Sequence, residues 1–121
     1  MAANVLDRFE FRSVRANEAE EVAEIEKICF PPHEVCSKKD MFERVEHAPE
    51  LFLVAVDKET GTIAGFLNGL ATDEEAFRDE FFTDITVHNP EGKNIFLLGL
   101  DVRPEYRRQG LAREIMNQYV K

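Results

Sequence analysis

Residues 97–112 read LLGLDVRPEYRRQGLA, and they form the most specific pattern in the chain. The segment begins with apolar residues typical of a buried strand, passes through a turn rich in arginine, and leads into a helix that starts near Gly110. The first backbone N–H groups of a helix have no partners inside it, and the helix dipole adds positive potential there. The segment therefore predicts a diphosphate-binding site at the start of the last helix.

Several residues of this turn suit an anion. Gly110 removes a Cβ that would obstruct the approach of a phosphate to the backbone, and Ala112 is small for a similar reason. Arg107 and Arg108 add positive charge in a chain whose formal net charge is −9. The alternative is an ordinary strand-to-helix connection with solvated arginines. The buried strand before the turn and the helix after it favour the phosphate site.

The strand before the turn contains an awkward residue. Strict alternation places Asp101 on the same face as Gly99 and Leu97, where a buried carboxylate is costly. We therefore expect a β-bulge near Leu100, which would re-aim the side chains and splay the strand from its neighbour. A splayed strand offers free N–H and C=O groups to an extended ligand that contains amides.

Hydrophobic periodicity and turn residues predict the remaining elements. They are a strand over residues 9–15, a helix ending near residue 30, a helix starting near residue 37, a hairpin of strands over residues 51–56 and 62–70, a short helix over residues 73–82 and a strand over residues 94–102. Asn17 with Glu20, and Ser37 with Asp40, have the spacing of helix starts.

The resulting order is β-α-α-β-β-α-β-α. A hairpin placed between helices favours an α/β (α+β) fold with a mixed, mostly antiparallel sheet flanked by helices. The length of 121 residues suits a single domain over residues 1–121.

Composition and charge exclude several classes of function. A net charge of −9 opposes binding to nucleic acid. No apolar run is long enough to cross a bilayer, and residues 1–10 lack the apolar stretch of a signal peptide, so we expect a cytoplasmic protein without a membrane partner. Cys29 and Cys36 do not have the spacing of a zinc site, which predicts two free thiols and no metal.

Residues 97–112 resemble the main cofactor motif of the GNAT acetyltransferase superfamily. Its signature, Q/R-x-x-G-x-G/A, is matched by Arg107, Gly110 and Ala112, and the predicted element order matches that fold. The chain is most similar to the arylalkylamine (serotonin) N-acetyltransferase branch. That closer likeness rests on residues 48–53, 64–70, 73–75 and 88–92.

The resemblance implies that acetyl-CoA is the co-substrate and that a small-molecule amine attacks its thioester directly. It also implies that the backbone at Leu100 polarises the thioester carbonyl, and that residues 30–35 help to form the amine pocket. Pantetheine would bind along the strand and pyrophosphate at the turn. The implied cofactor-binding residues are Leu100, Asp101, Val102, Arg107, Arg108, Gln109, Gly110, Leu111, Ala112 and Arg113.

Two features depart from the branch. Its paired histidines on the motif strand are replaced here by Phe96 and Leu98. Its general-acid tyrosine and the last strands of the fold would lie beyond Lys121. We therefore expect a C-terminally incomplete domain, or one completed by a homodimer or a domain-swapped copy.

Another side chain must then accept the proton of the amine. His33 and Glu34, in the loop expected to line the amine pocket, are the first catalytic candidates, although both could be solvated loop residues. Asp84, His88 and Asp101 are further candidates.

Three interpretations follow. The first is an acetyl-CoA-dependent amine N-acetyltransferase, and the second is a catalytically degenerate module that binds acyl-CoA without turnover. The third is an unrelated small α/β domain that binds a phosphate or a partner through Arg107 and Arg108.

Overall fold

The computed structural model describes residues 5–30, 32, 37–74 and 88–120. Its helices are α1 (Val5–Arg8), α2 (Ala19–Cys29), α3 (Lys38–His47) and α5 (Leu111–Tyr119). Its strands are β1 (Phe9–Ser13), β2 (Phe52–Asp57), β3 (Ile63–Thr72) and β4 (Asn94–Val102). Short 3₁₀ helices span Ala16–Glu18, Pro49–Leu51 and Pro104–Tyr106.

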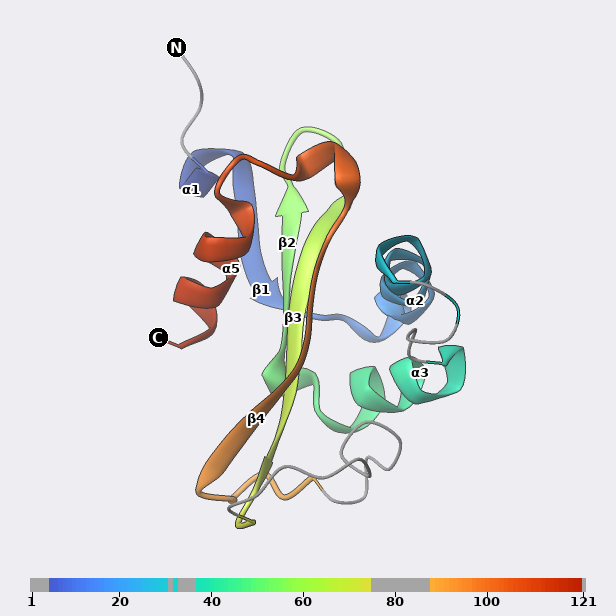
Figure 1. Ribbon diagram of the computed structural model, residues 1–121, viewed down its shortest axis with the longest axis vertical. Coiled ribbons are helices and arrows are strands. Elements are labelled where there is room, and N and C mark those ends of the chain that lie inside the picture. Colours follow the sequence, from blue (N-terminus) through green and yellow to red (C-terminus); the bar gives the residue numbers. More distant parts are fainter. Residues whose placement is uncertain (1–4, 31, 33–36, 75–87, 121) are drawn as a thin grey trace.

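The four described strands form one sheet in the order β1-β2-β3-β4, and every neighbouring pair is antiparallel. One row of directly paired residues crosses the whole sheet from Arg12 through Val54 and Phe66 to Asp101. Helix α5 covers one face of the sheet, while α2 and α3 cover the other (Figure 1). β4 lies at one edge of the described sheet, where it contacts α2.

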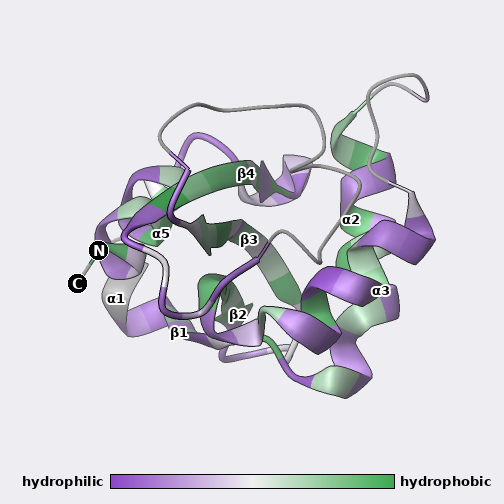
Figure 2. Cartoon of the chain, turned by 90° about the horizontal axis from the view of Figure 1, so that it is seen from below, coloured by the Kyte–Doolittle hydropathy of each residue, from purple (hydrophilic) through white to green (hydrophobic). Residues whose placement is uncertain are grey.

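The hydrophobic core is divided by the sheet into two layers. On the side of α2 and α3, buried residues such as Val22, Ile25 and Met41 pack against the sheet. On the side of α5, Leu111 and Ile115 pack against buried residues of the strands. β2, β3 and β4 are the most apolar strands of the cartoon, whereas α3 is largely hydrophilic (Figure 2).

The structure confirms the α/β class, the antiparallel hairpin and the strand over residues 94–102, whose bounds are those predicted. The helix start at Ser37 is also confirmed, because its hydroxyl accepts a 3.0 Å hydrogen bond from the N–H of Asp40. Helix α1 was not predicted. The predicted helix over residues 73–82 lies almost entirely outside the described residues, since positions 75–87 are not described.

The capping box predicted for Asn17 and Glu20 is wrong. Glu18 makes that contact instead, because its Oε1 accepts a 2.8 Å hydrogen bond from the N–H of Arg15. The same carboxylate pairs with Arg12 at 2.6 Å, and this bond lowers the pKa of Glu18. The ion pair with β1 therefore selects Glu18, a contact that local spacing alone does not reveal.

The predicted bulge exists, two residues from its expected position. Asn68 pairs with Gly99 while its neighbour Gly69 pairs with Leu97, so Leu98 is the extra residue of β4. The bulge turns Leu97 to the face of α5 and leaves Gly99 and Asp101 on the face of α2. β4 stays paired with β3 on both sides of the bulge, whereas the strand expected to splay from β4 would lie beyond Lys121.

Candidate functional site

The turn between β4 and α5 has an unusual backbone. Two of its residues, Arg108 and Gly110, have positive φ angles of 64° and 82°. An arginine in the left-handed region is uncommon and costs conformational energy. The space around the missing Cβ of Gly110 is open, so its φ angle is what requires glycine at this position in the described structure.

The backbone N–H groups of residues 108–113 have no acceptor among the described residues. The first hydrogen bond of α5 runs from the N–H of Glu114 to the carbonyl of Gly110, at 3.1 Å. The preceding N–H of Arg107 is already bonded to the carbonyl of Pro104, at 3.3 Å. Six consecutive amides at the start of a nine-residue helix are therefore available to a ligand.

A small pocket of about 120 Å³ adjoins these amides. Its lining residues come from the end of β4, the turn and the first residues of α5, and they are Val102, Tyr106, Arg107, Arg108, Gly110, Leu111, Ala112 and Arg113. The site faces solvent, since Arg108, Gly110 and Arg113 are all exposed. The geometry suits an anion that is held by backbone N–H groups and by the helix dipole.

The two arginines of the turn differ in role. Arg107 folds back on β4, where its Nε donates a 2.9 Å hydrogen bond to the carbonyl of Val102 and its NH2 lies 3.6 Å from Sγ of Cys29. The side chain of Arg108 is exposed and makes no hydrogen bond or ion pair with any other described residue. Arg108 is therefore the cation that an incoming anion can recruit at little structural cost.

Tyr106 fixes the turn to the sheet. Its ring packs edge-on against Phe9 with a centroid distance of 5.6 Å, and its hydroxyl donates a 2.8 Å hydrogen bond to Oδ2 of Asp57. Desolvation by burial and the contact with Asp57 raise the pKa of Tyr106. The hydrogen bond from the backbone of Glu59, followed by that from Tyr106, lowers the pKa of Asp57. The turn between β4 and α5 is thus held against the sheet by buried contacts.

β4 leads from the bulge to the turn along the edge of the described sheet. Its segment from Gly99 to Val102 is paired with β3 on one side, and no described strand pairs with the other. The side chains of Leu100 and Val102 belong to the core layer beneath α5, so an edge ligand would meet these residues through their backbone. The thiol of Cys29 lies 3.4 Å from the carbonyl of Val102, and burial raises its pKa.

Asp101 is buried at the same edge, where 1% of its surface is exposed. Neither of its carboxylate oxygens has a hydrogen-bond partner among the described residues. Burial, followed by the nearby carboxyl of Glu26, raises the pKa of Asp101 to about 9. Its side chain is therefore enclosed on the face of α2, and only its backbone belongs to the exposed edge.

The other proton-acceptor candidates fall into two groups. His33, Glu34 and Asp84 lie outside the described residues. His88 is described, and both of its ring nitrogens are engaged: Nδ1 accepts a 3.0 Å hydrogen bond from the N–H of Ala71, and Nε2 lies 2.7 Å from Oε1 of Glu50. Accepting at Nδ1 requires the proton on Nε2, so this ring holds a loop in place and has no free lone pair for an amine.

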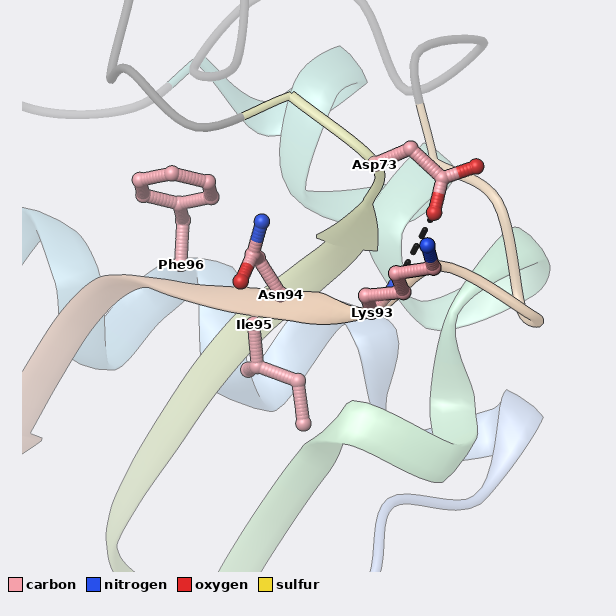
Figure 3. A pocket seen from close by; sticks show the side chains of 5 residues that line it. All are labelled: Asp73, Lys93, Asn94, Ile95 and Phe96. Atoms are coloured by element: carbon pink, nitrogen blue, oxygen red, sulfur yellow. Dashed lines mark hydrogen bonds between the residues drawn. The ribbon is translucent and has the colours of Figure 1, made fainter.

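A second, larger pocket of about 630 Å³ lies at the far end of β4. It is lined by Asp73, Lys93, Asn94, Ile95 and Phe96 (Figure 3). The side chains of Phe96 and Ile95 point to opposite sides of β4. The carboxylate of Asp73 accepts a 3.1 Å hydrogen bond from the backbone N–H of Lys93. Phe96 thus places an aromatic side chain at one of the two positions where the arylalkylamine branch has a histidine.

Sequence reasoning missed Glu26 and Arg44, which are both buried and face Asp101. A signal was present in the periodicity. Glu26 follows Val22 by four positions, and Arg44 follows Met41 by three, so each charged residue falls on the apolar face of its helix.

Within the described residues, no group of three or more His, Cys, Asp or Glu side chains could hold a metal ion. In the same part of the chain, no helix is both long enough and apolar enough to span a membrane.

Comparison with known proteins shows which family the chain resembles. The model of the acetyltransferase (GNAT) family matches residues 19–121, which include the turn and the strand before it. Among curated proteins, the chain is 28% identical to the probable hydrolase YhcX of Bacillus subtilis, covering 91% of this chain and 23% of that protein.

Solved structures share the fold. A GNAT-like decarboxylase, GphF, in complex with isobutyryl-CoA superposes with a TM-score of 0.80 at 21% identity, covering 92% of this chain and 57% of GphF. The N-acetyltransferase YhbS of Escherichia coli, in complex with CoA, has a TM-score of 0.62 at 21% identity, covering 92% of this chain and 53% of YhbS. The chain spans just over half of each solved structure and less than a quarter of YhcX. Since the family model covers most of its length, the chain belongs to the acetyltransferase (GNAT) family.

Proposed function

We propose that the chain binds acetyl-CoA through the turn and β4, and transfers the acetyl group to a primary amine. The observation that carries this proposal is the run of six unbonded amides at residues 108–113, beside a pocket at the start of α5. The pyrophosphate of coenzyme A is the group these amides would hold, since each N–H can donate to a phosphate oxygen and the helix dipole favours negative charge. The CoA and isobutyryl-CoA complexes of proteins with this fold support the choice of ligand.

The edge of β4 would guide the rest of the cofactor. Pantetheine contains two amides, and the backbone of residues 99–102 has an unpaired side among the described strands. An extended arm lying along this edge brings the thioester toward the bulge at Leu98. The N–H of Leu100 is our candidate for polarising the thioester carbonyl, because a fixed amide stabilises the oxyanion that forms during attack.

The amine would approach from the end of β4 that is farther from the turn. Phe96 offers an apolar surface in the large pocket, which Asp73 and Lys93 also line with one charge of each sign. An alkylamine must lose a proton before it attacks, and His33 and Glu34 remain our candidates for accepting it, directly or through water. In the transfer, the amine nitrogen forms a bond to the acyl carbon, the carbon–sulfur bond breaks, and coenzyme A leaves as a thiolate that takes up a proton. An aromatic alkylamine acceptor fits the resemblance to the arylalkylamine branch.

A second candidate is an acyl-CoA-binding module without turnover. The observation that favours it is the pair of apolar residues, Phe96 and Leu98, where the branch has histidines. Both candidates use the same turn, so they differ only in whether a thiol is released.

The test uses the full chain with acetyl-CoA and a panel of arylalkylamines and polyamines. Saturable binding with release of free thiol supports the transferase, and binding without thiol release favours the module. If acetyl-CoA does not bind, both candidates are wrong. Arg108→Ala should weaken binding several-fold, whereas Lys58→Ala, the same loss of charge at an exposed site on the β2–β3 turn, should not.

A further inference from the structure

Three buried charged residues from three different elements meet beneath β4. Glu26 comes from α2, Arg44 from α3 and Asp101 from β4, and their exposed fractions are 6%, 5% and 1%. Each of the other two acts electrostatically on Asp101. Arg44 also donates a 3.1 Å hydrogen bond from NH1 to Oδ1 of Asn68. Side chains of this kind are rarely buried unless their charges and hydrogen bonds are satisfied together.

The charges of this triad balance only if it holds a proton. With both carboxyls ionised, two negative charges would face one buried guanidinium, leaving a net charge of −1 in the interior. Burying an uncompensated charge is strongly unfavourable, and a buried group becomes protonated instead. One proton on the carboxyl pair makes the triad neutral.

The hydrogen bonds lead to the same conclusion independently. No described donor reaches either oxygen of Asp101, and the group that faces it, the carboxyl of Glu26, offers only acceptors when ionised. Two carboxyl groups can bond to each other only through a proton that lies between them. A shared proton therefore satisfies an oxygen that would otherwise be buried without a partner.

The triad is connected to the part of β4 that follows the bulge. Nδ2 of Asn68 donates a 3.3 Å hydrogen bond to the carbonyl of Gly99, and Asp101 lies two residues further along the strand. A Cβ at Gly99 would lie 3.5 Å from both Asn68 Nδ2 and Asp101 Oδ1, so the polar groups pack directly under the strand. These two hydrogen bonds, from Arg44 to Asn68 and from Asn68 to Gly99, thus position the carbonyl of Gly99, the residue that follows Leu98.

We propose that Glu26, Arg44 and Asp101 form a neutral triad that shares one proton beneath β4 and positions the strand segment over residues 99–102, so that loss of this proton weakens the binding of acyl-CoA. The three side chains act as positioning residues, since they reach the ligand only through the strand. The part concerning acyl-CoA rests on the proposed function, while the shared proton does not.

The expected pH dependence follows from the groups that surround the pair. Asp101 is faced by Glu26 and Cys29 from α2, by Arg44 from α3 and by Arg107 from the turn. β3 contributes Asn68, which is uncharged. When the shared proton is lost, a second negative charge appears between α2 and β4, and the packing that supports residues 99–102 is weakened.

Infrared spectroscopy of the unliganded full chain tests the proton directly. Exposed carboxyls are ionised at neutral pH, so a carbonyl band of a protonated carboxylic acid has to come from a buried group. We expect this band in the parent protein and its loss in both Glu26→Gln and Asp101→Asn. Glu24→Gln, the same change at an exposed position of α2, should keep the band. Absence of the band in the parent, or its persistence in both triad variants, would overturn the proposal.

The two single variants also test charge neutrality. Each replaces one carboxyl by an amide that can donate to the other, so each triad stays neutral without a proton and the protein should fold. The double variant leaves Arg44 facing two amides, and its loss of stability should exceed the sum of the single losses. Additive losses would contradict a triad that acts as one unit.

Calorimetric titration with CoA at about pH 8 and about pH 10 tests the link to binding. CoA affinity of the parent should fall several-fold more than that of Glu26→Gln, and the titration of the ligand itself cancels in this comparison. An equal fall in both proteins would refute the positioning role. If CoA binds neither protein, the proposed function fails and the positioning role fails with it, while the infrared result still decides whether the proton is shared.

Discussion

The hydroxyl of Tyr106 donates a 2.8 Å hydrogen bond to Oδ2 of Asp57, and both side chains are buried. This bond joins the turn after β4 to the end of β2, two segments that are 49 residues apart in the chain. The N–H of Glu59 donates to the other oxygen of Asp57, so the carboxylate also closes the β2–β3 turn. The buried carboxylate of Asp57 thereby stabilises both the β2–β3 turn and the turn between β4 and α5, where the candidate anion site lies.

Tyr106→Phe should destabilise the protein by about 2 kcal/mol, because a buried charged acceptor loses one of its donors. Tyr119→Phe is the matched control. It removes a 3.0 Å hydrogen bond to the neutral carbonyl of Leu51 and should cost only about 1 kcal/mol. Denaturant unfolding of both variants measures the difference, and a larger cost at Tyr119 would contradict the anchoring role of Tyr106.

Asp57 should make stability depend on acid pH. Its pKa is lowered in the folded protein, mainly by the N–H of Glu59 and then by Tyr106, so its contribution is present above the unfolded pKa of about 4 and is lost as the pH falls through the folded value. Asp57→Asn should therefore be destabilised at neutral pH, and its deficit relative to the parent should shrink as the pH is lowered below about 4. Unfolding curves over that range measure the deficit. A constant deficit would show that the ionised form is not the stabilising one.

Asp101 should make the protein less stable as the pH rises, which is opposite to the effect of Asp57. Its folded pKa is raised to about 9, so its stabilising contribution is full below the unfolded pKa and is lost progressively as the pH rises to the folded value. The parent should therefore lose stability relative to Asp101→Asn as the pH rises from about 4 to about 9. Unfolding free energies of the two proteins test this, and parallel curves across the range would rule out a raised pKa.

Gly110→Asp should reduce CoA affinity at least tenfold, which corresponds to about 1.4 kcal/mol, because a carboxylate at the start of α5 repels the pyrophosphate. Gly61→Asp is a close control, since Gly61 also has a positive φ angle, 74°, with open space around it, and lies in the β2–β3 turn. Both variants pay the same backbone penalty. Equal CoA affinities in the two variants would show that the turn does not hold the pyrophosphate.

Local sequence patterns predicted much of the fold and the strand–turn–helix geometry of the candidate site. The strand over residues 94–102, the helix start at Ser37 and the turn at Gly110 each depend on neighbouring residues, so a linear pattern contains enough information. The unbonded amides follow from the geometry of any helix start.

Features that depend on pairing between distant residues were misplaced or missed. The bulge lies at Leu98 because Asn68 and Gly69 of β3 select that register, and strict alternation along β4 cannot show it. The triad required the simultaneous positions of α2, α3 and β4. The sequence does contain one indication of the triad, because Glu26 falls on the apolar face of its helix.

The most direct test of the diphosphate site is a titration of the isotopically labelled full chain with CoA, followed by amide nuclear magnetic resonance. The largest shifts should occur at the N–H groups of residues 108–113, because these amides gain phosphate acceptors that they lack in the free protein. Unchanged resonances at these residues under saturating CoA, or shifts confined to the pocket around Phe96, would contradict the account.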